Sequence, residues 1–179
     1  MIAMRVKAEI MSQDQMRRAL KRMSHEILER NSGAANIVLI GILRRGKPLA
    51  EAIRENILQI EGVEVPVAEL DVSSFRDDIS ELTDRKDYLQ PALDIEGKDI
   101  VLVDDVIYTG RTTRAALDAC LSAGRAHSIQ LAVLIDRGHR EIPIRPDYVG
   151  KNVPTSKNER VNVLTMSTDG EDCVQLVEN

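Results

Sequence analysis

Three short and largely apolar runs limit the choice of fold for this chain. They span residues 37–43, 100–103 and 129–135, and the first two are followed by a polar turn and a helical pattern. Strands that are apolar on both faces belong to sheets covered on both sides, which is typical of parallel strands joined by helices. We expect an α/β fold with a mostly parallel, twisted sheet flanked by helices and right-handed crossovers.

Other patterns predict the remaining elements. Ser12 to Gln15 forms a capping box, and an apolar stripe continues a helix to about Asn31. Further helices are expected from Lys47 to about Gln59 and up to Ala123, with Gly124 as a left-handed residue that ends the helix. Weaker strands are predicted over residues 65–71, 161–164 and 173–177. Pro66 favours an edge position for the first of these, and residues 136–156 are predicted to be rich in turns.

Residues 73–97 are polar and irregular, which is long for a connection in a compact domain. Segments of this kind are either functional lids or disordered loops. The 179 residues fit one domain that spans residues 1–179.

Composition excludes several classes of protein. Cys120 and Cys173 lie far apart with no Cys or His at metal-ligand spacing, so neither a zinc knuckle nor a disulfide framework is expected. No apolar run approaches the roughly 20 residues of a membrane span, and the charged start lacks the apolar core of a secretion signal. The expected location is the cytoplasm, with no membrane as partner.

The charge is segregated along the chain. The formal net charge is −5, yet residues 12–30 hold five cations against three anions, and residues 137–160 hold six against three. Local excess of this kind matters more for phosphate contacts than the total charge does. A solvated charged face is the alternative for either segment. Stacking is not expected to dominate nucleic-acid binding, because the chain has only three Tyr and one Phe.

The strongest functional signal follows the second apolar run. Asp104 and Asp105 end this run, and Thr109 to Thr113 form a Gly- and Thr-containing turn before a helix. Ligands of open α/β sheets bind at the carboxyl ends of strands. Paired carboxylates suit sugar hydroxyls with a nearby cation, and the turn suits a phosphate. These residues indicate a ribose-5-phosphate site, with a capped strand-turn-helix as the alternative, and no Walker phosphate loop is present.

Residues 100–112 (IVLVDDVIYTGRT) resemble the phosphoribosyl pyrophosphate (PRPP) signature of type I phosphoribosyltransferases. The whole chain is more closely similar to the PyrR family, through the segments around Arg17, His25, Arg76, Asp136 and residues 148–156. The family couples regulation of the pyrimidine (pyr) operon to uracil phosphoribosyltransferase activity. The resemblance implies a type I phosphoribosyltransferase fold, with a flexible hood loop that carries Arg76, Arg85 and Lys86.

The resemblance implies specific roles at the site. Asp104 and Asp105 would hold the ribose hydroxyls of PRPP, and Arg45 would act on the pyrophosphate with Mg²⁺ bound through PRPP, so these three are the expected catalytic residues. The residues expected to bind PRPP or nucleotide are Arg44, Arg45, Asp104, Asp105, Val106, Ile107, Tyr108, Thr109, Gly110, Arg111, Thr112 and Arg137. The family usually has Thr where Arg44 stands and Tyr where Phe75 stands. An exposed loop cation is the alternative for Arg45.

The resemblance also implies the partners. Uracil or the base of UMP would lie near Asp136, Arg137 and residues 148–150, and Tyr108 favours a pyrimidine because purine-specific relatives commonly have an acid there. A dimer or higher homo-oligomer would bind a hairpin in the leader of pyr messenger RNA, more tightly with UMP bound. The expected RNA-binding residues are Lys21, Arg22, His25, Arg30, Arg140, Arg145 and Lys151. A purely metabolic phosphoribosyltransferase is the alternative function.

Overall fold

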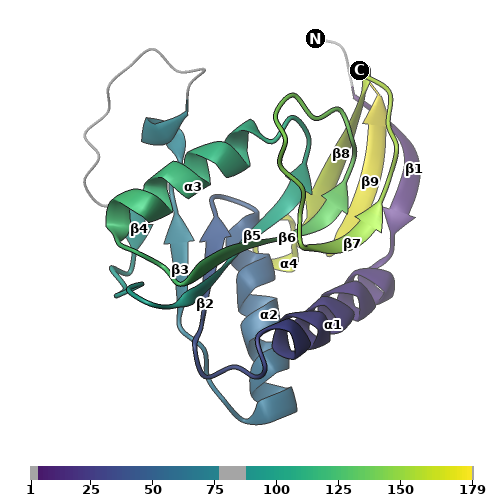
Figure 1. Cartoon of the computed structure of the whole chain (residues 1–179). Helices are drawn as coiled ribbons and strands as arrows, with labels where there is room; N and C mark the ends of the chain where they lie inside the picture. Colours follow the sequence, from purple (N-terminus) through teal and green to yellow (C-terminus); the bar gives the residue numbers. More distant parts are fainter. Residues whose placement is uncertain (1–3, 77–87, 179) are drawn as a thin grey trace.

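A six-stranded sheet forms the centre of the chain (Figure 1). The structure is a computed structural model and describes residues 4–76 and 88–178. Strand order is β4-β3-β2-β5-β6-β7, and every neighbouring pair is parallel except β3 and β4. The strands are β2 (Ile37–Ile42), β3 (Val67–Leu70), β4 (Leu89–Gln90), β5 (Asp99–Ile107), β6 (Ser128–Asp136) and β7 (Tyr148–Asn152).

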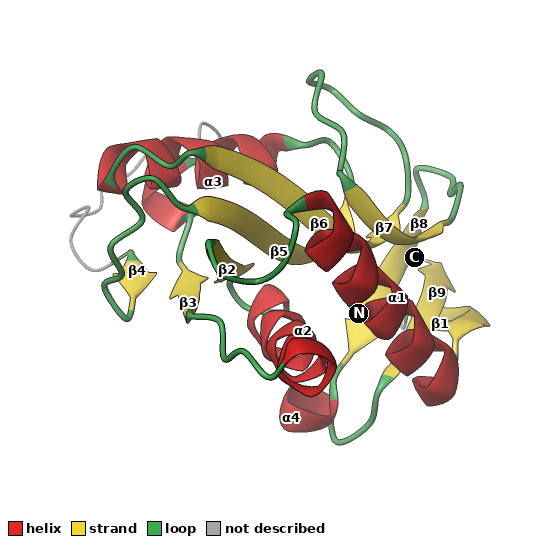
Figure 2. Cartoon of the chain, turned by 60° about the horizontal axis from the view of Figure 1, so that its bottom comes forward, coloured by secondary structure: helices red, strands yellow, loops and turns green. Residues whose placement is uncertain are grey.

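Helices cover both faces of this sheet because alternate strand residues point to opposite sides. Leu39 and Val101 face α1 (Gln13–Arg30) and α2 (Gly46–Glu61), whereas Ile40 and Leu102 face α3 (Arg111–Ala123). Figure 2 shows α1 and α2 together on one side and α3 on the other. The central strands are therefore buried on both faces, as the apolar runs predict. None of the described helices is both long and apolar enough to cross a membrane.

A second, antiparallel sheet of three strands lies beside the β7 edge (Figure 1). It has the order β1-β9-β8, from β1 (Arg5–Met11), β9 (Cys173–Glu178) and β8 (Glu159–Leu164). The short α4 (Met166–Asp169) connects β8 to β9. A single 3-10 turn, η1 (Ser73–Phe75), follows β3.

The predicted α/β fold is confirmed, and so is the capping box. The Ser12 hydroxyl accepts from the Gln15 backbone N–H at 3.2 Å, and the Gln15 side chain accepts from the Ser12 N–H at 2.9 Å. Residues 77–87 of the predicted hood segment, including Arg85 and Lys86, lie outside the described residues.

Four local predictions were wrong or incomplete. Gly124 does end α3, but its backbone is extended, with φ 160°. A Cβ there would lie 3.2 Å from Ile95 Cγ1, so crowding favours glycine. β3 is not the edge strand that Pro66 predicts. Pro66 lies just before β3, and the short β4 forms the edge by pairing with Glu69 and Leu70 of β3. The segment predicted to be rich in turns contains β7, and β1 was not predicted at all.

Candidate functional site

Three turns meet at the carboxyl edge of the large sheet. They follow β2 (residues 43–46, here the 43–46 loop), β5 (residues 108–110) and β6 (residues 137–140). Since these strands are parallel neighbours, the turns lie side by side at the place where open α/β sheets bind ligands.

Two glycines hold the 43–46 loop against β5. A Cβ on Gly41 would lie 2.6 Å from Lys47 Cα, and one on Gly46 would lie 2.2 Å from the Val103 carbonyl oxygen. No side chain fits at either position without moving backbone. This packing brings the loop and the first turn of α2 against the end of β5, directly before Asp104.

The acidic pair is asymmetric. Asp104 is only 9% exposed, whereas Asp105 is half-buried. Burial, and then the charge and hydrogen bonding of Asp105, raise the pKa of Asp104 well above its usual value. The Asp105 N–H donates to Asp104 Oδ1 at 2.9 Å, and the Val106 N–H donates to Asp105 Oδ1 at 2.8 Å. A ligand that brings hydroxyl donors or a cation would stabilise the charged pair.

A pocket of about 440 Å³ opens beside this pair at the start of α3. Gly110, with φ 92°, caps the helix in the left-handed region. The Thr109 hydroxyl accepts from the Arg111 N–H at 3.3 Å, and the Thr112 hydroxyl accepts from Arg76 Nη1 at 3.2 Å. The N–H groups of the first helical turn and these hydroxyls form a site suited to a phosphate. Its lining includes Arg76, Asp104, Tyr108, Thr109, Thr112 and Glu141.

Arg137 packs against this pocket from the β6 side. Its guanidinium carbon lies 4.0 Å from the centre of the Tyr108 ring, and the residue is 7% exposed. It donates to Thr155 Oγ1 at 2.9 Å and to the Glu159 carbonyl oxygen at 2.7 Å. Burial lowers the pKa of this arginine. Arg137 thus joins the turn after β6 to the segment before β8.

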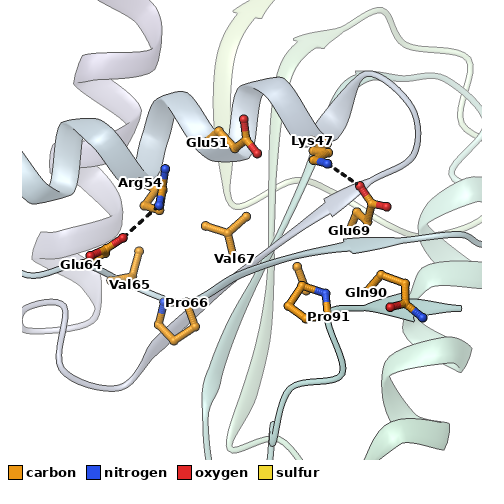
Figure 3. A pocket seen from close by; sticks show the side chains of 11 residues that line it. Lys47, Glu51, Arg54, Glu64, Val65, Pro66, Val67, Glu69, Gln90 and Pro91 are labelled. Carbon is orange, nitrogen blue, oxygen red and sulfur yellow. Dashed lines mark hydrogen bonds and ion pairs between the residues drawn. The ribbon is translucent and has the colours of Figure 1, made fainter. Parts of the chain in front are cut away.

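The cations of the 43–46 loop region face three different carboxylates. Arg45 forms an ion pair with Asp169 at the end of α4. Lys47 Nζ lies 2.8 Å from Glu69 Oε2 (Figure 3). Arg44 is exposed, and its charge helps to lower the pKa of Asp71, although hydrogen bonds from Ser73 lower it more.

The fold brings the two basic segments together. Arg22 of α1 donates to the carbonyl oxygens of Val149 at 3.1 Å and Gly150 at 2.7 Å in β7. Arg30 Nη1 lies 2.6 Å from Asp147 Oδ1. One continuous face therefore carries exposed side chains from both segments, here called the basic face. Its exposed cations and histidine are Lys21, Arg22, His25, Arg30, Arg145 and Lys151.

Arg140 has a different setting from the other members of that predicted RNA-binding set. Its guanidinium donates to the Tyr108 carbonyl oxygen at 2.9 Å, the Ile144 carbonyl oxygen at 2.8 Å and Asp136 Oδ2 at 2.6 Å. It therefore ties the turn after β5 to the turn after β6, between the phosphate pocket and the basic face.

Comparison with known proteins places this geometry in a family. Residues 7–167 match the phosphoribosyl transferase domain family. The "Bifunctional protein PyrR" of Acetivibrio thermocellus is 56% identical over 172 residues, which cover 95% of this chain and 94% of the relative. That of Thermus aquaticus is 55% identical over 177 residues, and these cover 98% of each chain. That of Clostridium perfringens is 51% identical over 178 residues, covering 98% and 100%. The chain belongs to the PyrR family.

Solved structures show that this PyrR-family chain has the type I phosphoribosyltransferase fold. The hypoxanthine phosphoribosyltransferase of Trypanosoma cruzi superposes with a TM-score of 0.74 at 21% identity, over 97% of each chain. A hypoxanthine-guanine phosphoribosyltransferase of Bacillus anthracis superposes with a TM-score of 0.72 at 20% identity, over 98% of this chain and 99% of that one.

Sequence reasoning missed residues in and next to the second sheet that support the site. Asp169 holds Arg45, Thr155 holds Arg137, and the Glu159 carboxylate accepts from the Ser156 N–H at 2.8 Å and pairs with Lys7. Apart from the contact between Glu159 and Ser156, each of these residues lies 18 or more positions from its partner. No local motif marks them in this PyrR-family sequence, so only the fold reveals them.

A larger pocket, of about 590 Å³, lies between α2, β3 and β4 (Figure 3). It holds none of the predicted site residues. Its lining cations Lys47 and Arg54 are paired with Glu69 and Glu64. Among residues 4–76 and 88–178, no group of three or more His, Cys, Asp or Glu side chains could hold a metal ion. Two carboxylates do not complete the octahedral shell of a magnesium ion, so water or substrate oxygens would supply its remaining ligands at the acidic pair.

Proposed function

We propose that this chain transfers the phosphoribosyl group of PRPP to uracil, giving UMP and pyrophosphate, and that it regulates pyr operon expression by attenuation. As a UMP-responsive regulator it binds a leader hairpin of pyr messenger RNA more tightly when UMP is bound. The observation that carries the catalytic half is the meeting of the acidic pair, the Thr109–Thr112 turn and the 43–46 loop at one edge of the sheet. Family membership supports both halves.

The geometry divides PRPP among these turns. The 5-phosphate occupies the pocket of residues 109–112, and the ribose hydroxyls reach Asp104 and Asp105. The pyrophosphate extends toward Arg44 and Arg45 at the 43–46 loop. Backbone of Val106, Ile107 and Tyr108 shapes the turn, and Arg111 begins α3 beneath the phosphate. Mg²⁺ bound through the pyrophosphate and the acidic pair would neutralise charge on the leaving group.

Catalysis at this site is electrostatic. The bond from the ribose C1 to the pyrophosphate oxygen breaks with its electron pair on that oxygen, a bond from C1 to uracil N1 forms, and the N1 proton passes to the departing pyrophosphate or to water. Negative charge grows on the pyrophosphate, where Arg45 stabilises it, and positive charge grows on the ribose ring above Asp104 and Asp105. The base lies near Tyr108 and Arg137, whose stacking fixes that side of the pocket.

The RNA half rests on the basic face. Six exposed side chains from α1 and from residues 145–151 form it, and these residues are far apart in sequence. Arg forks and a histidine suit the phosphates and splayed bases of a hairpin loop. Arg140 donates to the Tyr108 carbonyl oxygen at the nucleotide pocket and to the carbonyl oxygen of Ile144, the residue before Arg145 of the basic face, which supplies a route for UMP to affect RNA binding. We place this activity in the cytoplasm, where PRPP and messenger RNA meet, and in a dimer or higher homo-oligomer.

Two measurements test the proposal. The purified chain is incubated with uracil, PRPP and Mg²⁺, and UMP formation is expected in the unaltered protein and lost in Asp104→Asn. If the unaltered protein forms no UMP, the result would contradict the proposed enzymatic activity. A gel shift with a pyr leader hairpin should show binding that UMP strengthens at moderate salt. UMP synthesis without such binding would leave a purely metabolic enzyme.

A further inference from the structure

The backbone of the 43–46 loop is fixed, so the adjustable part is the side chain of Arg45. Gly41 and Gly46 leave no room between the loop, α2 and Val103, as described above. Arg45 precedes α2 and its side chain is 33% exposed. An arginine side chain has much rotamer freedom unless a partner restrains it. The partner of Arg45 therefore decides where its charge lies before substrate arrives.

That partner, Asp169, is held in place by its own turn. Asp169 Oδ2 accepts from the Thr165 N–H at 2.8 Å, and the Asp169 N–H donates to the Thr165 carbonyl oxygen at 2.7 Å. Asp172 Oδ1 accepts from the Met166 N–H at 2.6 Å and closes the same turn from the other side. The carboxylate of Asp169 is thus directed at Arg45 by contacts that do not involve Arg45.

Neighbouring cations do not share this arrangement. Lys47 turns to Glu69 on β3, on the side of the pocket in Figure 3, and Arg44 is exposed beside Asp71. Of these three cations, Arg45 alone has a described contact with α4, the helix that connects β8 to β9 of the second sheet. A guanidinium has five N–H donors, and the described contact of Arg45 to Asp169 uses Nη1. The remaining donors can bind a pyrophosphate while Asp169 keeps its place.

We propose that Asp169 is a positioning residue that holds Arg45 ready for the pyrophosphate of PRPP. This inference rests on the proposed phosphoribosyl transfer. Asp169 restrains the side chain in advance, so less freedom is lost when PRPP binds, and the charge already lies where the leaving group develops. The carboxylate does not touch the substrate and acts through Arg45.

The position of Asp169 gives the second sheet a role in the site. Thr165 and α4 follow the last residue of β8, and Glu159 is its first residue. The Glu159 carbonyl oxygen accepts from Arg137, at the other turn of the site. The first residue of β8 therefore holds Arg137 at the Tyr108 side, and the last residue of α4, the helix that follows β8, holds Arg45 at the pyrophosphate side. This arrangement explains why strands outside the large sheet matter for its ligand.

The test compares two Asp→Asn variants of the same turn. Asp169→Asn removes the negative charge that faces Arg45 but keeps an oxygen that can accept from the Thr165 N–H. Asp172→Asn is the matched control, because Asp172 closes the turn without contacting Arg45. We expect Asp169→Asn to raise the KM for PRPP about fivefold, within the range of direct couplings between neighbouring residues, with the KM for uracil unchanged. Asp172→Asn should leave both values unchanged.

A double-variant cycle separates positioning from general damage. Binding of inorganic pyrophosphate with Mg²⁺ is measured by calorimetry in the unaltered chain, Asp169→Asn, Arg45→Gln and the double variant. Asp169→Asn should weaken binding about fivefold on its own and have no effect when Arg45 is already Gln.

Each result has a defined meaning. The inference is overturned if Asp169→Asn binds PRPP and pyrophosphate as tightly as the unaltered chain or more tightly. It is also overturned if Asp169→Asn weakens pyrophosphate binding as much in the Arg45→Gln background as in the unaltered chain. If the unaltered chain forms no UMP, the proposed function fails. If it forms UMP but the cycle shows no coupling, the positioning role alone fails.

Discussion

In its charged form, Asp104 destabilises the folded chain. Its proposed role in binding the ribose hydroxyls explains why a carboxylate is buried at this position. A buried carboxylate beside a second one loses hydration and is repelled, so the pKa of Asp104 is raised. The folded state therefore binds a proton on the Asp104 carboxyl more tightly than the unfolded state does. As pH rises from the ordinary pKa of about 4 through the raised pKa, stability falls. Ribose hydroxyls would stabilise the charged form on binding.

We predict that Asp104→Asn stabilises the chain while it abolishes UMP formation. The amide cannot ionise, so it removes both the repulsion and this part of the pH dependence. The melting temperature at pH 7 should rise by about 2–4 °C, the shift that about 1 kcal/mol gives in a chain of this size. Thermal unfolding from pH 4 to pH 8 measures it. A lower melting temperature in the variant, or an unchanged slope with pH, would contradict the burial argument.

At the residue scale, the sequence predicts the part of the site whose residues lie close together along the chain. Asp104 and Thr109 to Thr112 are close in sequence, and the structure places them in the lining of one pocket, with Asp105 next to Asp104 in the chain. Thr155, Glu159 and Asp169 could not be found in this way. Their partners are Arg137 and Arg45, and long-range packing of the second sheet alone makes these pairs.

Among the elements, α1 connects the capping box to the basic face. Its apolar stripe packs under the sheet, and Arg22 and Arg30 reach β7 and the residue before it. The helix therefore sets the spacing of the exposed cations. Anything that frays its start weakens a surface that spans α1 and residues 145–151.

We predict that Ser12→Ala lowers the free energy of unfolding by about 1 kcal/mol, because it removes the acceptor for the Gln15 N–H. Chemical denaturation measures the change. Ser122→Ala is the matched control, since the Ser122 hydroxyl donates only to the Asp118 carbonyl oxygen one turn back and is expected to be nearly neutral. Equal losses in both variants would show that the cap has no special weight.

The basic face gives a prediction of its own. Lys21→Ala and Arg145→Ala should each weaken binding of the leader hairpin and reduce the slope of log affinity against log salt by about 0.7–0.9. UMP synthesis should be unchanged. Arg125→Ala is the control, because Arg125 is an exposed arginine in the loop between α3 and β6 and is not part of the basic face. Arg140→Ala should impair both activities, because Arg140 holds Tyr108 and Asp136. Unchanged salt slopes would place the RNA elsewhere.

Strands show where sequence patterns fail at this scale. β2, β5 and β6 are predictable because burial on both faces makes their central residues largely apolar. β7 contains Gly150, Lys151 and Asn152, which are poor strand formers, and pairing with β6 overrides that preference. A Cβ on Gly150 would lie 2.4 Å from the Leu134 carbonyl oxygen, so this glycine fits the close pairing. β1 has mostly exposed residues and no apolar pattern that marks it.

At the scale of the whole molecule, the two sheets are joined through the site. Arg137, which follows β6, donates to the Glu159 carbonyl oxygen of β8 at 2.7 Å, Lys151 of β7 donates to the Ile10 carbonyl oxygen of β1 at 3.3 Å, and Asp169, between β8 and β9, pairs with Arg45. We therefore propose that residues 1–179 unfold as one domain. Calorimetry should show a single transition, which UMP at 100 times its Kd stabilises by about 2.7 kcal/mol. Two separate transitions, or a UMP shift confined to one of them, would contradict this.

The most direct measurement is a crystal structure of the chain with UMP. The account predicts that the phosphate is bound by the backbone amides and hydroxyls of Thr109 to Thr112, with the ribose hydroxyls on Asp104 and Asp105 and the base near Tyr108. Electron density for UMP at any other place, with the Thr109–Thr112 turn free of phosphate, would contradict the account.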